Sequence, residues 1–429
     1  MNILFLTIGS FENFEAGSVH IDVVKTLASK GHQVYVACTN IAPEAEKVSF
    51  EQKNGVTLLR IKTGAVKKNT NLLKKGLATI MLESTFIKAI KKCFSDVKFN
   101  LVLYHTPPVT FEKVVRFIKE RDGAASYLLL KDIFPQNAVD LGMMSKKGLK
   151  GIVYHYFRRK EKNLYALSDY IGCMSPANVQ YLLEHNPYIS PERVEVAPNS
   201  VEFKVSGLDA SQKKNKYGIE RNYIHTKYNL PKDKPIFIYG GNLGKPQGID
   251  YLISCLDAVK DREDCCFLVV GNGSEFSKVD RWYKDNRCET IRVLCSLPKD
   301  DYDMLARSCD VGLIFLDHRF TIPNYPSRLL SYLQAKMPVL CATDSNTDIG
   351  RIAEENGYGF WCESVRPEDF VDLVDRMLKS DMKAMGIRGY DFLCKHYLAE
   401  HTCNAILKHF KISNEQNNDK LYSRSCASE

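Results

Sequence analysis

The hydrophobic residues of the chain alternate between short apolar runs and longer stretches with helical spacing. Apolar runs at 3–8 and 33–37 flank the segment 18–29, in which apolar residues recur at every fourth position, and Gly31 follows as a helix stop. Short strands separated by helices predict βαβ units, so the first half of the chain is expected to form a doubly wound parallel α/β sheet. Its other expected elements are strands at 56–61, 101–104, 127–130 and 170–174 and a long amphipathic helix at 72–94.

The same rhythm returns after an interruption at 202–234, which is polar and basic and contains several glycines and prolines. Beyond it, strands are expected at 236–239, 267–270, 292–294, 311–315, 339–341 and 359–361, followed by helices only, to about residue 410. The last amphipathic stretch still needs an apolar partner after the second core is complete. We therefore expect a first domain at 1–204, a second at 205–378 with a linker region at 205–234, helices at 379–412 that cross back to the first domain, and a disordered tail at 413–429.

Composition narrows the class of protein. The 429 residues are 45% apolar and 26% charged, which is ordinary for a globular protein with two cores. No stretch has the charge pattern of a secretory signal or the length of a membrane span. The 14 cysteines are scattered without a CxxC pair, so we expect core thiols in a reducing compartment and no zinc site. A net charge of +8 is too small to indicate nucleic acid, but it suits an anionic sugar nucleotide or an anionic membrane surface.

The strongest chemical signal is a glycine-rich turn after the apolar run 236–239. Its sequence is Gly240-Gly241-Asn242-Leu243-Gly244-Lys245, and a helix is expected to begin near Gly248. Glycines let backbone N–H groups approach a phosphate, the helix adds its positive end, and Lys245 adds a full charge. A plain strand-to-helix turn is the alternative, and the missing Gly-Lys-Ser/Thr ending excludes a Walker A loop.

A second signal is the segment Asn324-Tyr325-Pro326-Ser327-Arg328, which continues into Ser331. Arg328 is expected in the first turn of a helix, where a cation opposes the helix dipole unless an anion shares the site. An exposed surface arginine is the alternative.

Polar residues in the first half fall where strands end or helices begin. Gly17 precedes the first helix, His20 lies in its first turn, His105 follows the strand 101–104, and Asn199 lies in the turn that closes the first half. In open α/β sheets, ligands bind at the carboxyl ends of strands, although a lone histidine is more often structural.

Together these segments resemble the family 4 retaining glycosyltransferases of the GT-B fold, which build bacterial capsule, O-antigen or exopolysaccharide units. The turn 240–248 resembles that family's Gly-Gly/Asn-Leu-Gly-Lys-x-Gln-Gly turn, in which the lysine binds the donor diphosphate. Residues 326–332 resemble Pro-Ser-Lys-Leu-x-Glu-Tyr, and Val270-Gly271-Asn272-Gly273 resembles Val-Gly-x-Gly. Residues 197–202 resemble Ile-Pro-Asn-Gly-Val-Asp, and Lys131-Asp132-Ile133-Phe134-Pro135 resembles the Asp-Leu-Trp-Pro of fucosamine- and N-acetylhexosamine-type members.

The resemblance implies two doubly wound parallel-sheet domains that face each other across a cleft. It implies retaining transfer of an N-acetylated hexosamine or related sugar from a nucleotide donor, expected to be UDP-linked, to a lipid-linked or saccharide acceptor, without a metal. The expected catalytic residues are Lys245, Arg328 and His105. The expected donor-binding residues are Gly240, Gly241, Asn242, Gly244, Gly271, Gly273, Asn324, Ser327 and Ser331, and the expected acceptor or cleft residues are Gly17, His20, Asp132 and Asn199.

One departure from the family leaves alternatives open. The family often has two glutamates, eight positions apart, that contact the donor sugar and ribose, whereas this chain has Pro323 and Ser331 there. A nucleotide-sugar epimerase of the same architecture and a degenerate, non-catalytic binding protein are therefore alternatives. Basic amphipathic stretches at 72–94 and 146–160 also predict a cytoplasmic protein attached peripherally to the inner face of the plasma membrane, with no nucleic-acid partner. Helices that pack on their own sheet with a solvated lysine face are the alternative for these stretches.

Overall fold

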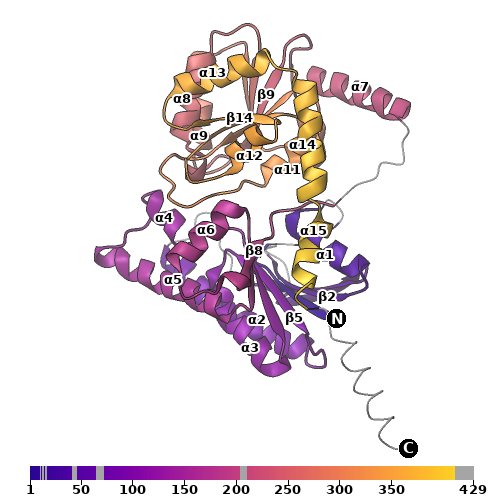
Figure 1. Ribbon diagram of the computed structural model, residues 1–429, viewed down its shortest axis with the longest axis vertical. Helices are drawn as coiled ribbons and strands as arrows, with labels where there is room; N and C mark the ends of the chain where they lie inside the picture. Colours follow the sequence, from indigo (N-terminus) through magenta and orange to yellow (C-terminus); the bar gives the residue numbers. More distant parts are fainter. Residues whose placement is uncertain are drawn as a thin grey trace, which may run out of the picture.

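The computed structural model describes residues 1–9, 11, 14, 17–40, 46–63, 72–202 and 210–410. Two parallel-sheet α/β domains are stacked along the long axis of the molecule (Figure 1). The expected fold class is therefore confirmed, while the expectation for the tail at 413–429 lies outside the described residues. No helix in the described ranges combines the length and the apolar character needed to cross a membrane.

The first domain contains an eight-stranded sheet in the order β3-β4-β2-β1-β5-β6-β7-β8. All neighbours are parallel except the edge hairpin of β3 and β4, and β3 was not expected from the sequence. The strands are β1 (Asn2–Leu6), β2 (Gln33–Asn40), β3 (Val48–Lys53), β4 (Val56–Lys62), β5 (Leu101–Thr106), β6 (Ala125–Leu130), β7 (Tyr170–Cys173) and β8 (Val194–Val196). The helices are α1 (Val19–Ser29), α2 (Leu72–Cys93), α3 (Glu112–Asp122), α4 (Gln136–Asp140), α5 (Gly148–Leu167) and α6 (Pro176–His185), with 3-10 turns η1 (Val109–Phe111) and η2 (Pro191–Arg193).

Alternate side chains of β1 serve two separate cores, as a sheet covered on both faces requires. Leu4 and Leu6 pack with apolar residues of α2 and α3, whereas Ile3 and Phe5 pack with those of α1 and α15. Ser18 caps α1 by accepting a hydrogen bond from the backbone N–H of Ile21, which explains why this helix begins where the sequence predicts.

The second domain contains a six-stranded, wholly parallel sheet in the order β11-β10-β9-β12-β13-β14. Its strands are β9 (Ile236–Asn242), β10 (Cys266–Asn272), β11 (Ile291–Leu294), β12 (Val311–Phe315), β13 (Val339–Thr343) and β14 (Gly359–Glu363). Its helices are α8 (Ile249–Val259), α9 (Phe276–Asn286), α10 (Lys299–Arg307), α11 (Arg328–Gln334), α12 (Ile349–Glu355) and α13 (Pro367–Leu378), with a 3-10 turn η3 (Lys245–Gln247). β9 lies at the centre, next to the point where the strand order reverses, which is where ligands bind in such sheets.

The part of the chain that connects the first sheet to the second contains a long helix, α7 (Ala210–Lys227). This helix packs against α10 on the outside of the second domain (Figure 1). At the other end, α14 (Met382–His396) packs against α11, and α15 (Ala399–Leu407) packs against α1. The crossing to the first domain therefore takes place at Tyr397–Leu398 rather than from 379, because the Gly386 and Gly389 face of α14 lies directly against the second domain.

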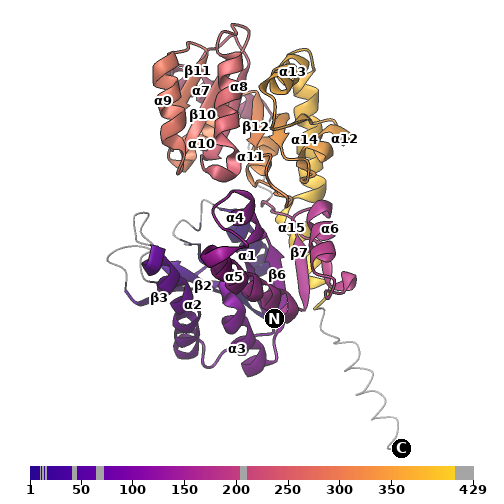
Figure 2. The ribbon, with the colours of Figure 1, turned by 90° about the vertical axis from the view of Figure 1, so that its left-hand side faces the viewer.

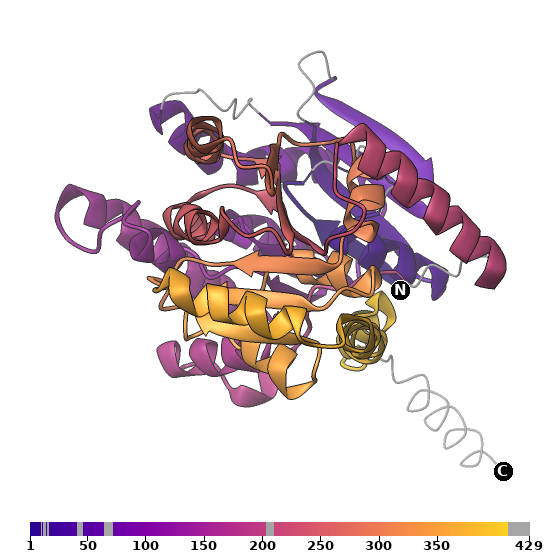
Figure 3. The same ribbon diagram turned by 90° about the horizontal axis from the view of Figure 1, so that it is seen from above.

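The carboxyl ends of the two sheets face each other. α4 and α6, which follow β6 and β7, lie at the boundary with the second domain (Figure 2). Seen from above, the second domain lies over the first, and α5 extends beyond it (Figure 3). The loops that follow the strands of both domains therefore meet at a single interface.

Candidate functional site

The glycine-rich turn after β9 is built for close backbone packing. A Cβ atom on Gly271 would lie 1.8 Å from the carbonyl oxygen of Gly241, and one on Gly273 would lie 2.2 Å from that of Leu243. The turns after β9 and β10 therefore fit together only because both positions are glycine. Gly241 also has φ +131°, a conformation that other residues rarely adopt.

Arg328 lies against this turn. It is the first residue of α11, and its guanidinium carbon lies 4.3 Å from the ring centroid of Tyr239, over the face of the ring. Its Nη2 atom is 3.3 Å from where a Cβ on Gly241 would be. Nη1 is buried and has no hydrogen-bond partner among the described residues. A buried guanidinium without a carboxylate is costly, so this position is suited to an anion.

A tyrosine fixes α11 on the sheet. The hydroxyl of Tyr332 accepts a hydrogen bond from the backbone N–H of Gly240 at 3.0 Å, and it lies 3.2 Å from the carbonyl oxygens of Ile238 and Leu313. The side chain of Tyr302 packs directly against Gly240, because a Cβ atom on Gly240 would lie 1.9 Å from the Tyr302 hydroxyl. Tyr239, Tyr302 and Tyr332 were not among the residues predicted for the site, although Tyr332 belongs to the motif that placed Arg328 there.

Lys245 begins η3 directly after the turn. Its side chain is exposed and forms no ion pair within the described ranges. The turn beneath it is ordered by Gln247, whose Oε1 accepts hydrogen bonds from Asn242 Nδ2 at 3.0 Å and from the backbone N–H of Gly244 at 3.1 Å. Gly248 then takes a left-handed conformation, φ 58°, and starts α8. Lys245 is therefore next to the glycine turn but is not held in place by a protein partner.

The remaining predicted donor residues lie before and within α11. The backbone carbonyl of Asn324 accepts a hydrogen bond from the hydroxyl of Thr347, while the buried Asn324 Nδ2 has no partner in the part of the chain that the structure describes. Ser327 is exposed at the start of α11, and Ser331 is half-buried one turn later. Arg328 and Asn324 thus each present an unpaired nitrogen from one continuous segment.

The residues before Arg328, 316–327, connect β12 to α11, include Asn324 and are docked on the first domain; we call them the strap. Phe320 and Ile322 are 2% and 0% exposed, in the same apolar cluster as Ile133 and Leu141 of the first domain. The strap therefore belongs to the second domain by sequence and to the first domain by packing.

Hydrogen bonds also join the strap to the first domain. Asp140 accepts from the backbone N–H of Thr321 at 2.9 Å and from its hydroxyl at 2.9 and 3.0 Å. Asn178 Nδ2 donates to the buried carbonyl oxygen of Pro323 at 2.7 Å. The strap is thus held by both α4 and α6.

The first domain places two histidines at its facing edge. The rings of His20 and His105 are stacked with centroids 4.1 Å apart, and His105 Nε2 lies 2.8 Å from Thr7 Oγ1. Burial lowers the pKa of His105 to about 4. Burial, with the charges of His105 and Lys131 adding to it, holds the pKa of His20 well below its usual value. Both rings are therefore neutral near pH 7.

Lys131 and Asp132 follow β6 at the same edge. Lys131 Nζ donates to the carbonyl oxygen of Ala197 at 3.2 Å, and burial lowers the pKa of this amine to about 7. Burial raises the pKa of the Asp132 carboxyl to about 6, although its two oxygens accept from Asn137 Nδ2 at 2.9 Å. In the described ranges Asn199 Oδ1 is buried without a partner.

Gly17 lies directly before Ser18, the residue that caps α1. It has φ +72°, and a Cβ there would lie 2.8 Å from Asp22 Oδ1. Asp22 Oδ2 accepts a hydrogen bond from the backbone N–H of Glu202 at 3.1 Å, so α1 is tied to the loop that leaves the first domain. In the described part of the chain, no hydrogen bond or ion pair joins the predicted first-domain residues to Lys245 or Arg328, and their catalytic and acceptor roles stay predictions.

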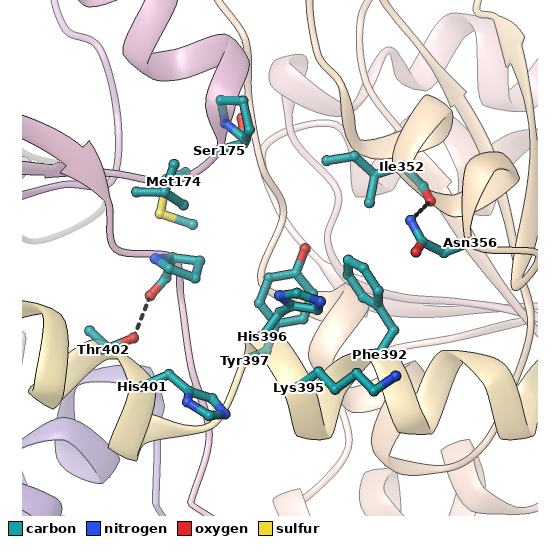
Figure 4. A pocket seen from close by; sticks show the side chains of 13 residues that line it. Met174, Ser175, Ile352, Asn356, Phe392, Lys395, His396, Tyr397, His401 and Thr402 are labelled. Carbon is teal, nitrogen blue, oxygen red and sulfur yellow. Dashed lines mark hydrogen bonds between the residues drawn. The ribbon is translucent and has the colours of Figure 1, made fainter.

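A cavity of about 420 Å³ lies beside the crossing point of the chain, with walls from both domains (Figure 4). Met174 and Thr402 line one side, and Ile352, Phe392 and His396 line the other. None of the predicted donor residues lines this cavity. Among the described residues, no group of three or more His, Cys, Asp or Glu side chains is arranged to hold a metal ion.

Comparison with known structures defines the class of protein. The chain superimposes on sucrose-phosphate synthase from Thermosynechococcus elongatus with a TM-score of 0.71 and 13% identity, covering 100% of both chains. It matches Anabaena Alr3699/HepE, solved in complex with UDP, with a TM-score of 0.65 and 12% identity, covering 96% of this chain and 99% of that one. The fold is therefore that of the GT-B glycosyltransferases.

Sequence comparison adds the family and the individual proteins that this chain resembles. Residues 220–391, which cover most of the second domain, match the family described as Glycosyl transferases group 1. The chain is 26% identical over 317 residues to the probable glycosyltransferase WbjE of Pseudomonas aeruginosa, covering 73% of this chain and 74% of WbjE. It is 20% identical over 346 residues to the putative colanic acid biosynthesis glycosyl transferase WcaI of Escherichia coli strain K12, covering 78% and 81%. The resemblance to glycosyltransferases of polysaccharide biosynthesis is thus confirmed.

Proposed function

We propose that this chain is a retaining glycosyltransferase that moves a sugar from a UDP-linked donor to a lipid-linked or saccharide acceptor in surface-polysaccharide synthesis. The observation that carries the proposal is Arg328, a cation with a buried, unpaired Nη1 beside the Gly241 turn. A guanidinium in that position matches the geometry of a phosphate oxygen pair. The nearby backbone N–H groups and Lys245 add positive potential for a diphosphate.

The reaction follows from where charge develops. The bond between the anomeric carbon and the β-phosphate oxygen breaks, and a new bond forms to the acceptor oxygen on the same face. The acceptor proton passes to the departing phosphate oxygen, so no carboxylate nucleophile is needed. Arg328 and Lys245 stabilise the charge that grows on the diphosphate, and such groups contribute about 2–4 kcal/mol each elsewhere. We propose that they replace a metal ion.

Two further points support the donor assignment. Anabaena HepE, which shares the fold, was solved with UDP. The Lys131–Pro135 segment resembles members that act on N-acetylated hexosamines, and we propose such a sugar here. Because Pro323 and Ser331 replace the family's paired glutamates, we propose that Asn324 Nδ2 binds a hydroxyl of the donor instead.

Calorimetric titration of the protein with UDP, GDP and dTDP tests the proposal. We expect UDP to bind without added metal and the Arg328→Met variant to lose most of that affinity. Incubation with UDP-N-acetylhexosamines then separates the alternatives by product analysis. Conversion of the donor to its epimer without acceptor would favour the epimerase, and binding without any conversion in the presence of lipid-linked acceptors would favour the non-catalytic protein.

We further propose that the first domain attaches to an anionic membrane through α5. Ile152, Val153 and Tyr156 are 67%, 47% and 41% exposed on one face of this helix. Exposed basic residues surround them: Lys146, Lys147, Arg159 and Lys162. An exposed apolar face with a basic border is typical of helices that lie on membranes.

The structure corrects which residues of the basic stretches can take part. Lys160 pairs with Glu83 and Glu112 at 3.1 Å, because it lies on the side of α5 that packs on the domain. Arg158 likewise pairs with Glu161, and Tyr154 is 9% exposed. In the described part of α2, Phe86 and Ile90 lie in the core, whereas Lys88, Lys91 and Lys92 are exposed.

Sedimentation with vesicles tests this attachment. We expect the protein to bind phosphatidylglycerol vesicles and this binding to weaken with salt, because surface charges are screened within about 8 Å at physiological ionic strength. We also expect an Ile152→Ser/Tyr156→Ser variant to lose the binding, because it lacks the exposed apolar face. Equal binding to neutral and anionic vesicles would contradict it.

A further inference from the structure

We infer that Asp140, a residue of the first domain, is a positioning residue for the donor site of the second domain. This inference rests on the proposed function, because it concerns how Arg328 and Asn324 are held for the donor. Asp140 lies at the end of α4 and contacts neither residue. Its effect passes through the strap, residues 316–327.

The first step is the contact between Asp140 and Thr321. The carboxylate accepts one backbone and two hydroxyl contacts from this single residue, at 2.9, 2.9 and 3.0 Å. Gln136 Nε2 lies 2.6 Å from Asp140 Oδ1 and 3.4 Å from Thr321 Oγ1, so it braces both partners. A hydrogen bond to a charged group is stronger than one between neutral groups, so this contact fixes Thr321 relative to α4.

The second step leads from Thr321 to the donor residues. Only two residues separate Thr321 from Asn324, and four more lead to Arg328. On either side of Thr321, Phe320 and Ile322 are buried against the first domain. A shift of the strap at Thr321 therefore reaches Asn324 through only two residues, of which Pro323 is also held by Asn178.

The third step is the support from behind. The loop after β13 holds the strap, since Asn346 Nδ2 donates to the carbonyl oxygen of Phe320 at 2.6 Å and the Thr347 hydroxyl donates to that of Asn324. The backbone N–H groups of Asn346 and Thr347 in turn donate to Asp344 Oδ1 at 2.9 Å. The strap is thus held between this loop and the first domain, and removal of the Asp140 carboxylate leaves only Asn178 at Pro323 and the longer Gln136 contact at Thr321 as the side-chain hydrogen bonds described above on the first-domain side.

A double-mutant cycle tests the inference. We expect Asp140→Ala to weaken UDP binding about tenfold and to lower turnover, Thr321→Val to have a smaller effect because its backbone N–H still donates to Asp140, and the double variant to be no worse than Asp140→Ala alone. The matched control is Glu184→Ala, which removes an exposed carboxylate that accepts from Gln180 four residues earlier at 2.8 Å, as Asp140 does from Gln136. Additive effects in the double variant, or an equal loss in Glu184→Ala, would overturn the inference.

Hydrogen exchange separates this inference from the proposed function. In Asp140→Ala we expect faster amide exchange at Thr321 and in the following residues 322–330, with an unchanged melting temperature. The exchange measurement needs no ligand, so it tests the inference even if UDP does not bind the wild-type protein. A failure of UDP to bind would count against the proposed function alone. Unchanged exchange in residues 322–330 would overturn the inference, whatever binds.

Discussion

The basic side chains at the facing edges of the two domains differ in their charge state. In the first domain, His105 is buried and His20 and Lys131 are half-buried, and desolvation lowers the pKa of each toward a neutral side chain. In the second domain, the corresponding cation is the half-buried Arg328, which stays charged at every physiological pH. A permanent charge is suited to a diphosphate, whereas neutral donors and acceptors are suited to the hydroxyl groups of a sugar acceptor.

The sharpest test of this comparison is removal of the permanent charge. We expect Arg328→Met to lower kcat/KM for the donor by about 10²–10³-fold, since the guanidinium stabilises charge that grows in the transition state. Arg328→Lys should recover little of this loss, because an ammonium cannot match the guanidinium fork over Tyr239. Steady-state kinetics with varied donor would measure both. Near-normal rates in the lysine variant would mean that charge alone matters.

Lys245 should matter less, because it is exposed and no residue in the described ranges forms an ion pair with it. We expect Lys245→Ala to lower turnover at saturating donor about tenfold and UDP affinity by a smaller factor, since its contribution increases as the diphosphate gains charge. Single-turnover rates and calorimetry would separate the two effects. Unchanged turnover at saturating donor would remove Lys245 from the site.

The first-domain edge makes a prediction about stability rather than rate. The pKa of Lys131 is lowered from 10.5 to about 7, so between these values the unfolded chain binds a proton that the folded protein does not. Folding stability should therefore rise with pH from about 7 toward 10.5. Lys131→Met should remove this part of the slope in melting temperatures recorded at pH 7 and pH 9. The control is Lys383→Met, a change at an exposed lysine of α14; an identical slope in Lys131→Met would contradict the prediction.

His105 gives a smaller effect at the acidic end. Its pKa is lowered from 6.5 to about 4, so the protein should lose stability as pH falls from about 6.5 to 4 and keep all of this contribution above 6.5. We expect His105→Gln, which keeps a hydrogen bond to Thr7, to flatten that part of the curve. Denaturant titrations at pH 4.5 and 7 would show it, and a parallel fall in both proteins would assign the acid sensitivity elsewhere.

Much of this architecture could be predicted from local pattern. The helices at 18–29 and 72–94 were predicted to within a residue or so because apolar spacing defines both of them, and Ser18 also caps the first. The edge strand β3 was missed because its residues alternate polar and apolar without a buried face. The placement of Arg328 beside Gly241 was predicted because one motif supplied a cation and the other a place for an anion.

Other features depend on contacts that sequence pattern does not reveal. Thr321 lies between Phe320 and Ile322 in a stretch without helical or strand periodicity, and its partner Asp140 is 181 residues away in the other domain. The lowered pKa of Lys131 depends on desolvation in the folded protein, which the residues next to it in the sequence do not indicate. Such features arise from the meeting of two domains, whereas the predictions from sequence were made for each domain separately.

The strap also has a consequence for how fast the enzyme works. Separating the domains would expose Phe320 and Ile322, and each buried apolar side chain of this size contributes about 1.5–3 kcal/mol. The open form would then be roughly 10²- to 10⁴-fold less populated than the closed one. If the nucleotide leaves only when the domains separate, its release, rather than sugar transfer, will limit turnover and will speed up steeply with temperature.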